Sequence, residues 1–290
     1  MGSIPASPLS EIASVHQVLL WHRHDIPQMS KWKRRVKHVL GRVIFGLGLH
    51  RRFLGGRGVI VAFHRVDDDL EGNAISCTTA EFTEFCLFFR RYFEVVSLEQ
   101  FLDDLEEGQP LGGKLVITFD DGYRDNHLTA APILESLGLP ACFFITTGFV
   151  GTDRVPWWDE DWGIQSRWMS WAEVHDLASR GFELGAHTVN HPDLGKLEGP
   201  EAVAEIQESR NQLQREVERP ILFFAYPFGR PDQISEANRE VVRTLGFRCC
   251  LSGHGGTVET GADPFRLLRT PISPWHLSPY QFGVELLIQR

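Results

Sequence analysis

The sequence predicts an α/β fold, a distorted and incomplete (β/α) barrel of about seven parallel strands. Short apolar runs of strand length alternate with helical stretches along most of the chain. Repeated strand–helix units favour parallel pairing with right-handed crossovers, and seven such strands suggest a barrel that does not close fully. The chain has 290 residues, of which 42% are hydrophobic and 23% charged. This composition suffices for one barrel-sized core and excludes a disordered or fibrous protein.

Turn and cap signals separate the expected strands. Two helices are expected to begin with capping boxes, at Thr78 with Glu81 and at Ser170 with Glu173. Gly138 is expected to end a helix, because glycine readily adopts the left-handed conformation found there. The strands are expected, in chain order, at residues 59–63, 94–96, 115–119, 141–145, 182–186, 221–225 and 247–251.

The first 57 residues are expected to form a basic, partly helical extension that precedes one domain over residues 58–290. Residues 1–66 contain eleven Lys and Arg against two acidic residues, a net charge of +9; the whole chain carries −9, so the remainder carries −18. In residues 31–57 the cations are interleaved with apolar side chains. One interpretation is peripheral contact with an anionic membrane, and another is a helix packed on the domain. The apolar part is far shorter than the ~20 residues that span a bilayer.

The five cysteines add an indication of compartment. They are odd in number and include no Cys-x-x-Cys pair. Such usage is typical of small buried side chains in a reducing compartment. We therefore expect a cytoplasmic protein, with peripheral attachment to the inner membrane face through residues 31–57 as a further expectation.

Two groups of polar residues follow expected strands. Asp120 and Asp121 end the run 115–119 and precede Gly122, and His187 and His191 follow another strand. Each group alone also suits a turn, since Asp-Asp-Gly is common turn chemistry and twelve histidines make a close pair unsurprising. Together they fall on the rim of one sheet, at the carboxyl ends of its strands. One carboxylate and two imidazoles bind a divalent cation with a position left for water, and the spare carboxylate can act as a base.

Three segments resemble the first three motifs of the polysaccharide deacetylases, which form carbohydrate esterase family four, also called the NodB-homology family. They are residues 118–126 (TFDDGYRDN), 187–194 (HTVNHPDL) and 224–229 (FAYPFG), within a resemblance over roughly residues 58–273. The resemblance implies a (β/α) barrel that hydrolyses N-acetyl groups on hexosamine units of a polysaccharide or its glycan precursor, with the aid of a metal, and releases acetate.

By this resemblance Asp120 is the general base, and Asp121, His187 and His191 bind one divalent metal ion. This donor set suits Zn, and also Co, Ni or Fe. A neighbouring carboxylate then needs only to orient the attacking water and accept its proton.

The third motif implies two further roles. The backbone N–H of Phe228 is expected to donate to the oxyanion, because Pro227 has no N–H. Tyr226 is expected to contact the substrate.

The sequence departs from the family at two positions. Ala225 stands where many members have the Arg that pairs with the base, and we expect Arg269 to replace it, although a solvated surface Arg is the alternative. Many members supply the general acid as a Leu-x-His near the C-terminal end, which this chain lacks after Arg269. His64, after the first strand, resembles the acid of a subgroup of exopolysaccharide deacetylases; a structural His is the alternative. His276 lies near the usual position but has different neighbours.

Tryptophan is concentrated in one insertion. Five of the eight Trp lie within fifteen residues: Trp157, Trp158, Trp162, Trp168 and Trp171. The first three are candidates to stack on sugar rings from a loop over the barrel rim, and the last two suit core positions near a helix start.

The expected partner is therefore an N-acetylated glycan, and no nucleic-acid partner is expected. Two other functions fit the same residues. One is a non-catalytic carbohydrate-binding protein on this fold, which would have no need of a spare carboxylate beside a metal. The other is a deacylase of a small or lipid-linked amide.

Overall fold

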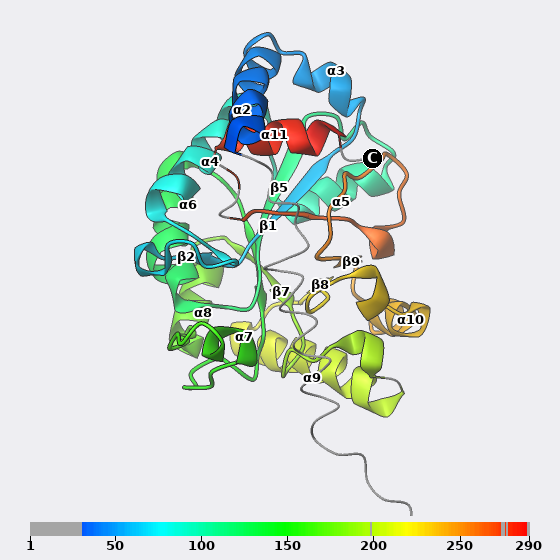
Figure 1. Cartoon of the computed structure of the whole chain (residues 1–290). Helices are drawn as coiled ribbons and strands as arrows, with labels where there is room; N and C mark the ends of the chain where they lie inside the picture. The colour runs from blue at the N-terminus through cyan, green and yellow to red at the C-terminus, as the bar shows by residue number, and fades with distance from the viewer. Residues whose placement is uncertain (1–30, 198, 274–275, 277, 289–290) are drawn as a thin grey trace, which may run out of the picture.

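The computed structural model describes residues 31–197, 199–273, 276 and 278–288. Its centre is a curled sheet of eight parallel strands in the order β10-β1-β5-β6-β7-β8-β9, with β4 also paired to β5 (Figure 1). All seven predicted strands are present, each within two residues of its predicted bounds. They are β1 (Val59–Phe63), β4 (Glu94–Val95), β5 (Lys114–Phe119), β6 (Cys142–Ile145), β7 (Glu183–Ala186), β8 (Phe223–Ala225) and β9 (Cys249–Leu251), joined by β10 (Thr270–Pro271).

The sheet curls into a barrel because the chain after β9 returns to the first strand. On one side of β5, β4 pairs with the beginning of the strand and β6 with its end. At the open edge, Leu267 forms a single bridge with Leu251 of β9, and Thr270 and Pro271 pair with β1. The short segment 267–271 thus joins both edges, so the barrel is distorted and only weakly closed, as the sequence predicts.

Strand side chains alternate between the barrel interior and the surrounding helices. The side chains that face the helices form one hydrophobic cluster, the outer core, and those that face the barrel interior form a second, the inner core. On β5, Leu115, Ile117 and Phe119 belong to the outer core, whereas Val116 belongs to the inner core. The same alternation turns Asp120, the residue after β5, toward the interior. The inner core therefore lies directly below the polar residues at the carboxyl ends of the strands.

Helix α5 packs against the inner core at the amino ends of the strands. Its residues Phe101 and Leu102 lie in the same cluster as Val116. Glu183, the first residue of β7, accepts hydrogen bonds from the backbone N–H groups of Leu98 and Glu99 at 2.7 and 2.8 Å and caps the helix. The amino end of the barrel is thereby filled, which leaves the carboxyl ends for the site.

The remaining helices surround the sheet (Figure 1). The capping boxes predicted at Thr78 and Ser170 are confirmed, and Gly138 ends α6 with a φ of 65°, as predicted. The sequence analysis missed the two-residue strands β2 (Arg65–Val66) and β3 (Ser76–Cys77), which pair only with each other. The described helices are α2 (Lys31–Gly46), α3 (His50–Leu54), α4 (Thr79–Tyr92), α5 (Leu98–Glu106), α6 (Ala131–Leu137), α7 (Trp157–Glu160), α8 (Trp171–Ser179), α9 (Pro200–Val217), α10 (Glu236–Thr244) and α11 (Pro279–Ile288).

The described part of the N-terminal extension lies on the barrel domain rather than apart from it. Helix α2 runs along α11, and α3 follows at the same end of the molecule (Figure 1). Phe45 of α2 is buried in the outer core beside Phe88. Within the described residues, no helix has both the length and the apolar character required to cross a membrane.

Candidate metal centre and active-site cavity

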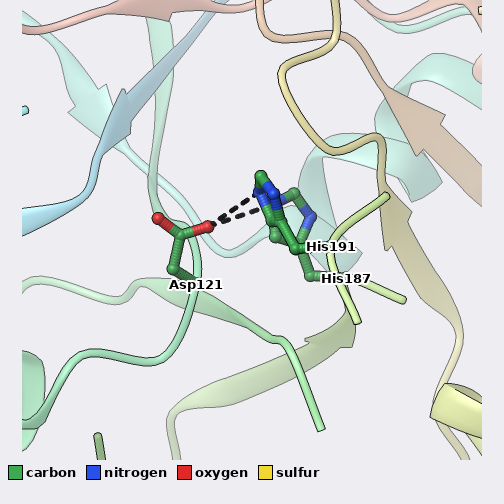
Figure 2. Close-up of side chains that lie close together, drawn as sticks. All are labelled: Asp121, His187 and His191. Carbon is green, nitrogen blue, oxygen red and sulfur yellow. Dashed lines mark ion pairs between the residues drawn. The ribbon is translucent and has the colours of Figure 1, made fainter. Parts of the chain in front are cut away.

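Asp121, His187 and His191 converge at the carboxyl ends of β5 and β7. The Asp121 carboxylate faces both imidazole rings (Figure 2), with Oδ1 3.4 Å from Nε2 of His187 and 3.2 Å from Nε2 of His191. One ligand atom from each residue lies within 4.8 Å of the others, and all three side chains are buried. The structure thus brings together the three residues that the sequence predicts as metal ligands.

The hydrogen bonding of this cluster fits a cation. Nδ1 of His187 lies 2.8 Å from the carbonyl oxygen of Ala225; donation to that oxygen leaves Nε2 with a lone pair toward Asp121. Oδ1 of Asp121 is buried and has no hydrogen-bond partner among the described residues. An unpartnered carboxylate oxygen facing imidazole nitrogens is costly unless a positive charge lies between them. The three residues therefore suit a divalent ion, and the nitrogen and oxygen donors match those of zinc sites.

The loops that carry these groups are strained. Asp121, Thr188, His191 and Phe228 have φ values of 73°, 65°, 56° and 57°, in the left-handed region that non-glycine residues seldom adopt. At Asp121 the backbone makes a tight turn in which the N–H of Gly122 donates to the carbonyl of Asp120. Such strain is typical of functional sites, where the surrounding structure holds it in place.

Asp120 points into the barrel and pairs with Arg269. The guanidinium donates to both carboxylate oxygens at 2.7 Å, and its other hydrogen bonds go to the Ser252 carbonyl at 2.6 Å and the Thr118 hydroxyl at 3.1 Å. Arg269 is fully buried, with its guanidinium 5.6 Å from the ring centre of Phe144. The contact expected between Arg269 and Asp120 is therefore present, and the surface alternative for Arg269 is wrong.

The charges of the site set the protonation of its acids and imidazoles. Burial acts to raise the pKa of Asp120, but Arg269 and His187 outweigh it and lower that pKa. Burial opposes ionisation of Asp121 as well, yet His191 and His187 hold its pKa well below the ordinary value. For His191 burial prevails over Asp121 and lowers the pKa, which favours the neutral imidazole that binds metals.

A cavity of about 380 Å³ opens over this centre. Small-ligand sites are usually lined by apolar and aromatic side chains together with a few polar groups that orient the ligand. All but two of the sequence-predicted site residues line it: His64, Asp120, Asp121, Trp157, Trp158, Trp162, His187, His191 and Phe228. Arg269 lies beneath it, where it contacts Asp120.

His64 and Phe228 both line the cavity over the proposed metal centre. His64 follows β1, is partly exposed, and lines the cavity beside both aspartates. Among the described residues the N–H of Phe228 has no hydrogen-bond partner. His276, by contrast, is 3.3 Å from Glu285 and packs against Phe282, and it does not line the cavity. The geometry therefore favours His64 over His276 as the proton donor.

A buried network holds the tryptophan insertion over the centre. The hydroxyl of Tyr123 donates to Asp159 at 3.0 Å and accepts from the indole N–H of Trp158 at 2.8 Å. Arg65 lies 4.3 Å from the ring centre of Tyr123 and 3.7 Å from Asp159. The Trp158 ring is thereby placed 4.7 Å from that of His191.

Of the other tryptophans in the insertion, two lie at the cavity and two in packed positions, as expected. Trp157 stacks near Phe228 with ring centres 6.3 Å apart, and Trp162 is 43% exposed at the cavity. Trp168 is buried against Tyr123, and Trp171 packs on the outer core.

The prediction that Tyr226 contacts the substrate is wrong. Tyr226 follows β8 and shares the outward face of Phe224, with their ring centres 5.1 Å apart in the outer core. It is 1% exposed and does not line the cavity. Because side chains alternate along a strand, Tyr226 is expected on the same outward face as Phe224, two residues before it.

The sequence analysis missed a histidine in the cavity, a residue type that can transfer protons or bind a metal. His254 lies in the glycine-rich loop after β9 and lines the cavity. Its Nδ1 is 2.6 Å from the carbonyl oxygen of Gly229, which fixes the ring. A signal was available, because a histidine between two glycines lies three residues after the end of a predicted strand, close to where His187 lies after its own.

Comparison with known proteins agrees with this arrangement. The family model described as polysaccharide deacetylase matches residues 107–250, a range that contains Asp120 and all three proposed metal ligands. The Bacillus subtilis protein YxkH is 22% identical over 78% of this chain and 75% of its own length. The poly-β-1,6-N-acetyl-D-glucosamine N-deacetylase of Escherichia coli K12 is 28% identical over 46% of this chain, which corresponds to 20% of that protein.

Solved structures show the same fold. The Streptococcus pyogenes deacetylase PplD, in complex with acetate, has a TM-score of 0.65 at 20% identity and covers 78% of this chain and 96% of its own. IcaB from Ammonifex degensii has a TM-score of 0.65 at 21% identity and covers 78% of this chain and 97% of its own. From its motifs, its barrel and the family model that it matches, the chain belongs to the polysaccharide deacetylase family.

Proposed function

We propose that this protein is a metal-dependent hydrolase that removes N-acetyl groups from hexosamine units of a polysaccharide or its glycan precursor and releases acetate. One observation carries the proposal: the buried Asp121–His187–His191 cluster lies beside a second carboxylate, Asp120, that Arg269 holds in the same cavity. A protein that only binds carbohydrate would have no use for that second carboxylate. Membership of the polysaccharide deacetylase family supports the same activity.

Asp121 through Oδ1 and the two histidines through Nε2 would hold one divalent ion. When bound, the ion supplies a Lewis acid that lowers the pKa of water to about 7 and polarises the acetamide carbonyl. Zn is the first candidate, and Co, Ni or Fe suit the same donors.

Asp120 accepts the proton of the attacking water. Arg269 occupies one lone pair on each carboxylate oxygen, so each oxygen keeps another for this purpose. The guanidinium also keeps Asp120 ionised, because it offsets the effect of burial on its pKa. Arg269 is thus a positioning residue that fixes both the direction and the charge of the base.

His64 protonates the leaving nitrogen while the C–N bond breaks and the water oxygen becomes part of acetate. Its ring lines the cavity and is only partly buried, so it can exchange protons with solvent between turnovers. The N–H of Phe228, which has no hydrogen-bond partner among the described residues, donates to the oxygen that gains negative charge as the water adds.

Aromatic walls favour a sugar as the substrate. Trp157, Trp158 and Trp162 line the cavity, and indole faces bind the apolar faces of sugar rings. The Escherichia coli relative is named for poly-β-1,6-N-acetyl-D-glucosamine, which makes this polymer the first to test.

Acetate release tests the proposal. The full chain is stripped of metal with a chelator, reloaded in turn with Zn, Co, Ni or Fe, and assayed on β-1,6- and β-1,4-linked N-acetylglucosamine oligomers, a lipid-linked N-acetylhexosamine and N-acetylated small amines. We expect acetate from at least one glycan only after reloading. Folded, reloaded protein that releases no acetate from any of them would overturn the proposal, and release from small amines alone would identify the deacylase alternative.

A further inference from the structure

Exposed apolar side chains are concentrated on the N-terminal helices, at the end of the molecule where α2 and α3 lie with α11 (Figure 1). Twelve large hydrophobic side chains are exposed in the described residues, and eight of them belong to residues 32–53. An apolar patch of this kind on a soluble surface usually marks a binding site. The eight are Trp32, Val36, Val39, Leu40, Val43, Leu47, Leu49 and Phe53.

Six of these residues, from Trp32 to Leu47, form one stripe along α2. At about 100° per residue they fall within an arc of about 100°, the width of the apolar face of an amphipathic helix. Leu47 lies just past the last residue of α2, and its N–H donates to the carbonyl of Val43, so the helical path includes it. We call this set the outer stripe.

The opposite face of α2 is fixed to the protein. Lys37 forms an ion pair with Glu285 at 3.0 Å, and the His38 ring nitrogen lies 2.6 Å from the Ser278 hydroxyl. A Cβ added at Gly41 would lie 2.2 Å from the carbonyl oxygen of Tyr280, so the two helices touch backbone to backbone there. An amphipathic helix normally turns its apolar face to the core; α2 is held with that face outward.

Cations flank the outer stripe. On the helical wheel Lys33 lies on one side of it and Arg35 and Arg42 on the other. Exposed Arg51 and Arg52 lie on α3. Apolar side chains bordered by Lys and Arg are the pattern of helices that lie in a membrane interface.

The charge distribution selects an anionic surface over a second copy of the chain. Residues 1–66 carry +9 and the remainder −18. Two copies that met through their outer stripes would bring two strongly basic segments together, which is unfavourable. Anionic lipid headgroups complement the same cations while the acyl chains accept the apolar side chains.

We propose that the outer stripe of α2, with its flanking cations and α3, docks this protein on an anionic lipid surface. Helix α2 lies in the plane of the interface and does not cross the bilayer. The proposal does not depend on the proposed catalytic activity, because none of its residues lines the active-site cavity.

Vesicle flotation with the full chain tests the proposal. Vesicles of phosphatidylglycerol with phosphatidylcholine are compared with pure phosphatidylcholine at low and high salt. We expect flotation with the anionic vesicles, weakened about tenfold or more by salt or by the neutral lipid. No flotation, or equal flotation with both lipids at both salt concentrations, would overturn the proposal.

Charge placed on the outer stripe supplies the second test. Val36→Asp/Val43→Asp should lose about tenfold or more in vesicle affinity with an unchanged melting temperature, because both side chains are exposed. The matched control, Leu87→Asp/Leu128→Asp, changes exposed side chains on α4 and on the short π-helix η2 (Asn126–Ala130) before α6, and should float as wild type does.

Three results of these two tests, with sedimentation added to measure self-association, would overturn docking. Wild-type flotation by the Val36→Asp/Val43→Asp variant would remove the stripe from the binding surface. Sedimentation that shows a dimer of the wild type, which this variant dissociates, would assign the stripe to a second copy. If the full chain neither floats nor self-associates, residues 1–30 of the same chain become the candidate partner of the outer stripe.

Discussion

Replacing Arg269 with Met should destabilise the protein through Asp120. The substitution removes both 2.7 Å hydrogen bonds to the carboxylate and leaves that carboxylate buried without its charge partner. Breaking one side of a buried ion pair costs about 3–5 kcal/mol in the free energy of unfolding. Asp120→Asn/Arg269→Met removes both charges and should lose about 2–3 kcal/mol less than the sum of the losses in the two single variants, a difference that is the coupling energy of a double-mutant cycle.

The loss in Arg269→Met should also depend on pH. Without Arg269, burial is the largest influence left on the pKa of Asp120 and acts to raise it, so we expect the folded variant to bind a proton more readily than the unfolded chain. Its stability should therefore improve as the pH falls and be lowest above the raised pKa. In active protein the acid limb of the pH–rate profile should move to higher pH.

Urea unfolding of chelator-treated protein, followed by tryptophan fluorescence, measures these values without a metal contribution. The matched control is Arg266→Met, which removes an exposed Arg from a 2.6 Å pair with Glu236 and should cost no more than about 1 kcal/mol. Additive losses in the Asp120/Arg269 cycle, or an Arg269→Met variant as stable as the control, would refute the argument from the buried pair.

Three further predictions concern other residues. His64→Ala should lower kcat about 10²- to 10⁴-fold with metal content unchanged, whereas His276→Ala should keep most of the rate; the reverse would move the acid to the C-terminal end. Trp162→Ala should raise KM for the glycan polymer and Trp32→Ala should not; equal effects would remove the stacking role. Burial opposes ionisation of Glu285, but hydrogen bonds, first that of His276, lower its pKa to about 2. Glu285→Gln should therefore be less stable than wild type in urea unfolding above about pH 5, and this difference should vanish as the pH falls toward 2.

The strands that can be predicted most readily from a sequence are those with long apolar runs. β5 and β6 are recognisable because every residue of their runs 115–119 and 142–145 is buried, and such burial requires apolar side chains throughout. β10 has two residues, one of them a proline, and its pairing depends on where the chain returns after β9. No local pattern carries that information.

The candidate site was predictable where metal chemistry or the family resemblance selects residues. Two carboxylates and two histidines on one rim suit a metal and a base, and the resemblance implied that Asp121 is the ligand and that Arg269 replaces the Arg missing at Ala225. Positions that depend on packing were harder. Tyr226 sits in a motif segment but faces the outer core, and the place of His254 depends on the path of a glycine-rich loop.

The most direct test of the proposed metal-dependent deacetylation is the bound metal and the acetate release of Asp120→Asn, measured on the same preparation. The substitution removes a carboxylate that is not among the three proposed ligands. We predict one metal ion per chain, as in wild type, together with a rate about 10²- to 10⁴-fold lower. Loss of the metal, or an unchanged rate with the metal retained, would contradict the assignment of Asp120 as the base beside an Asp121–His187–His191 metal centre.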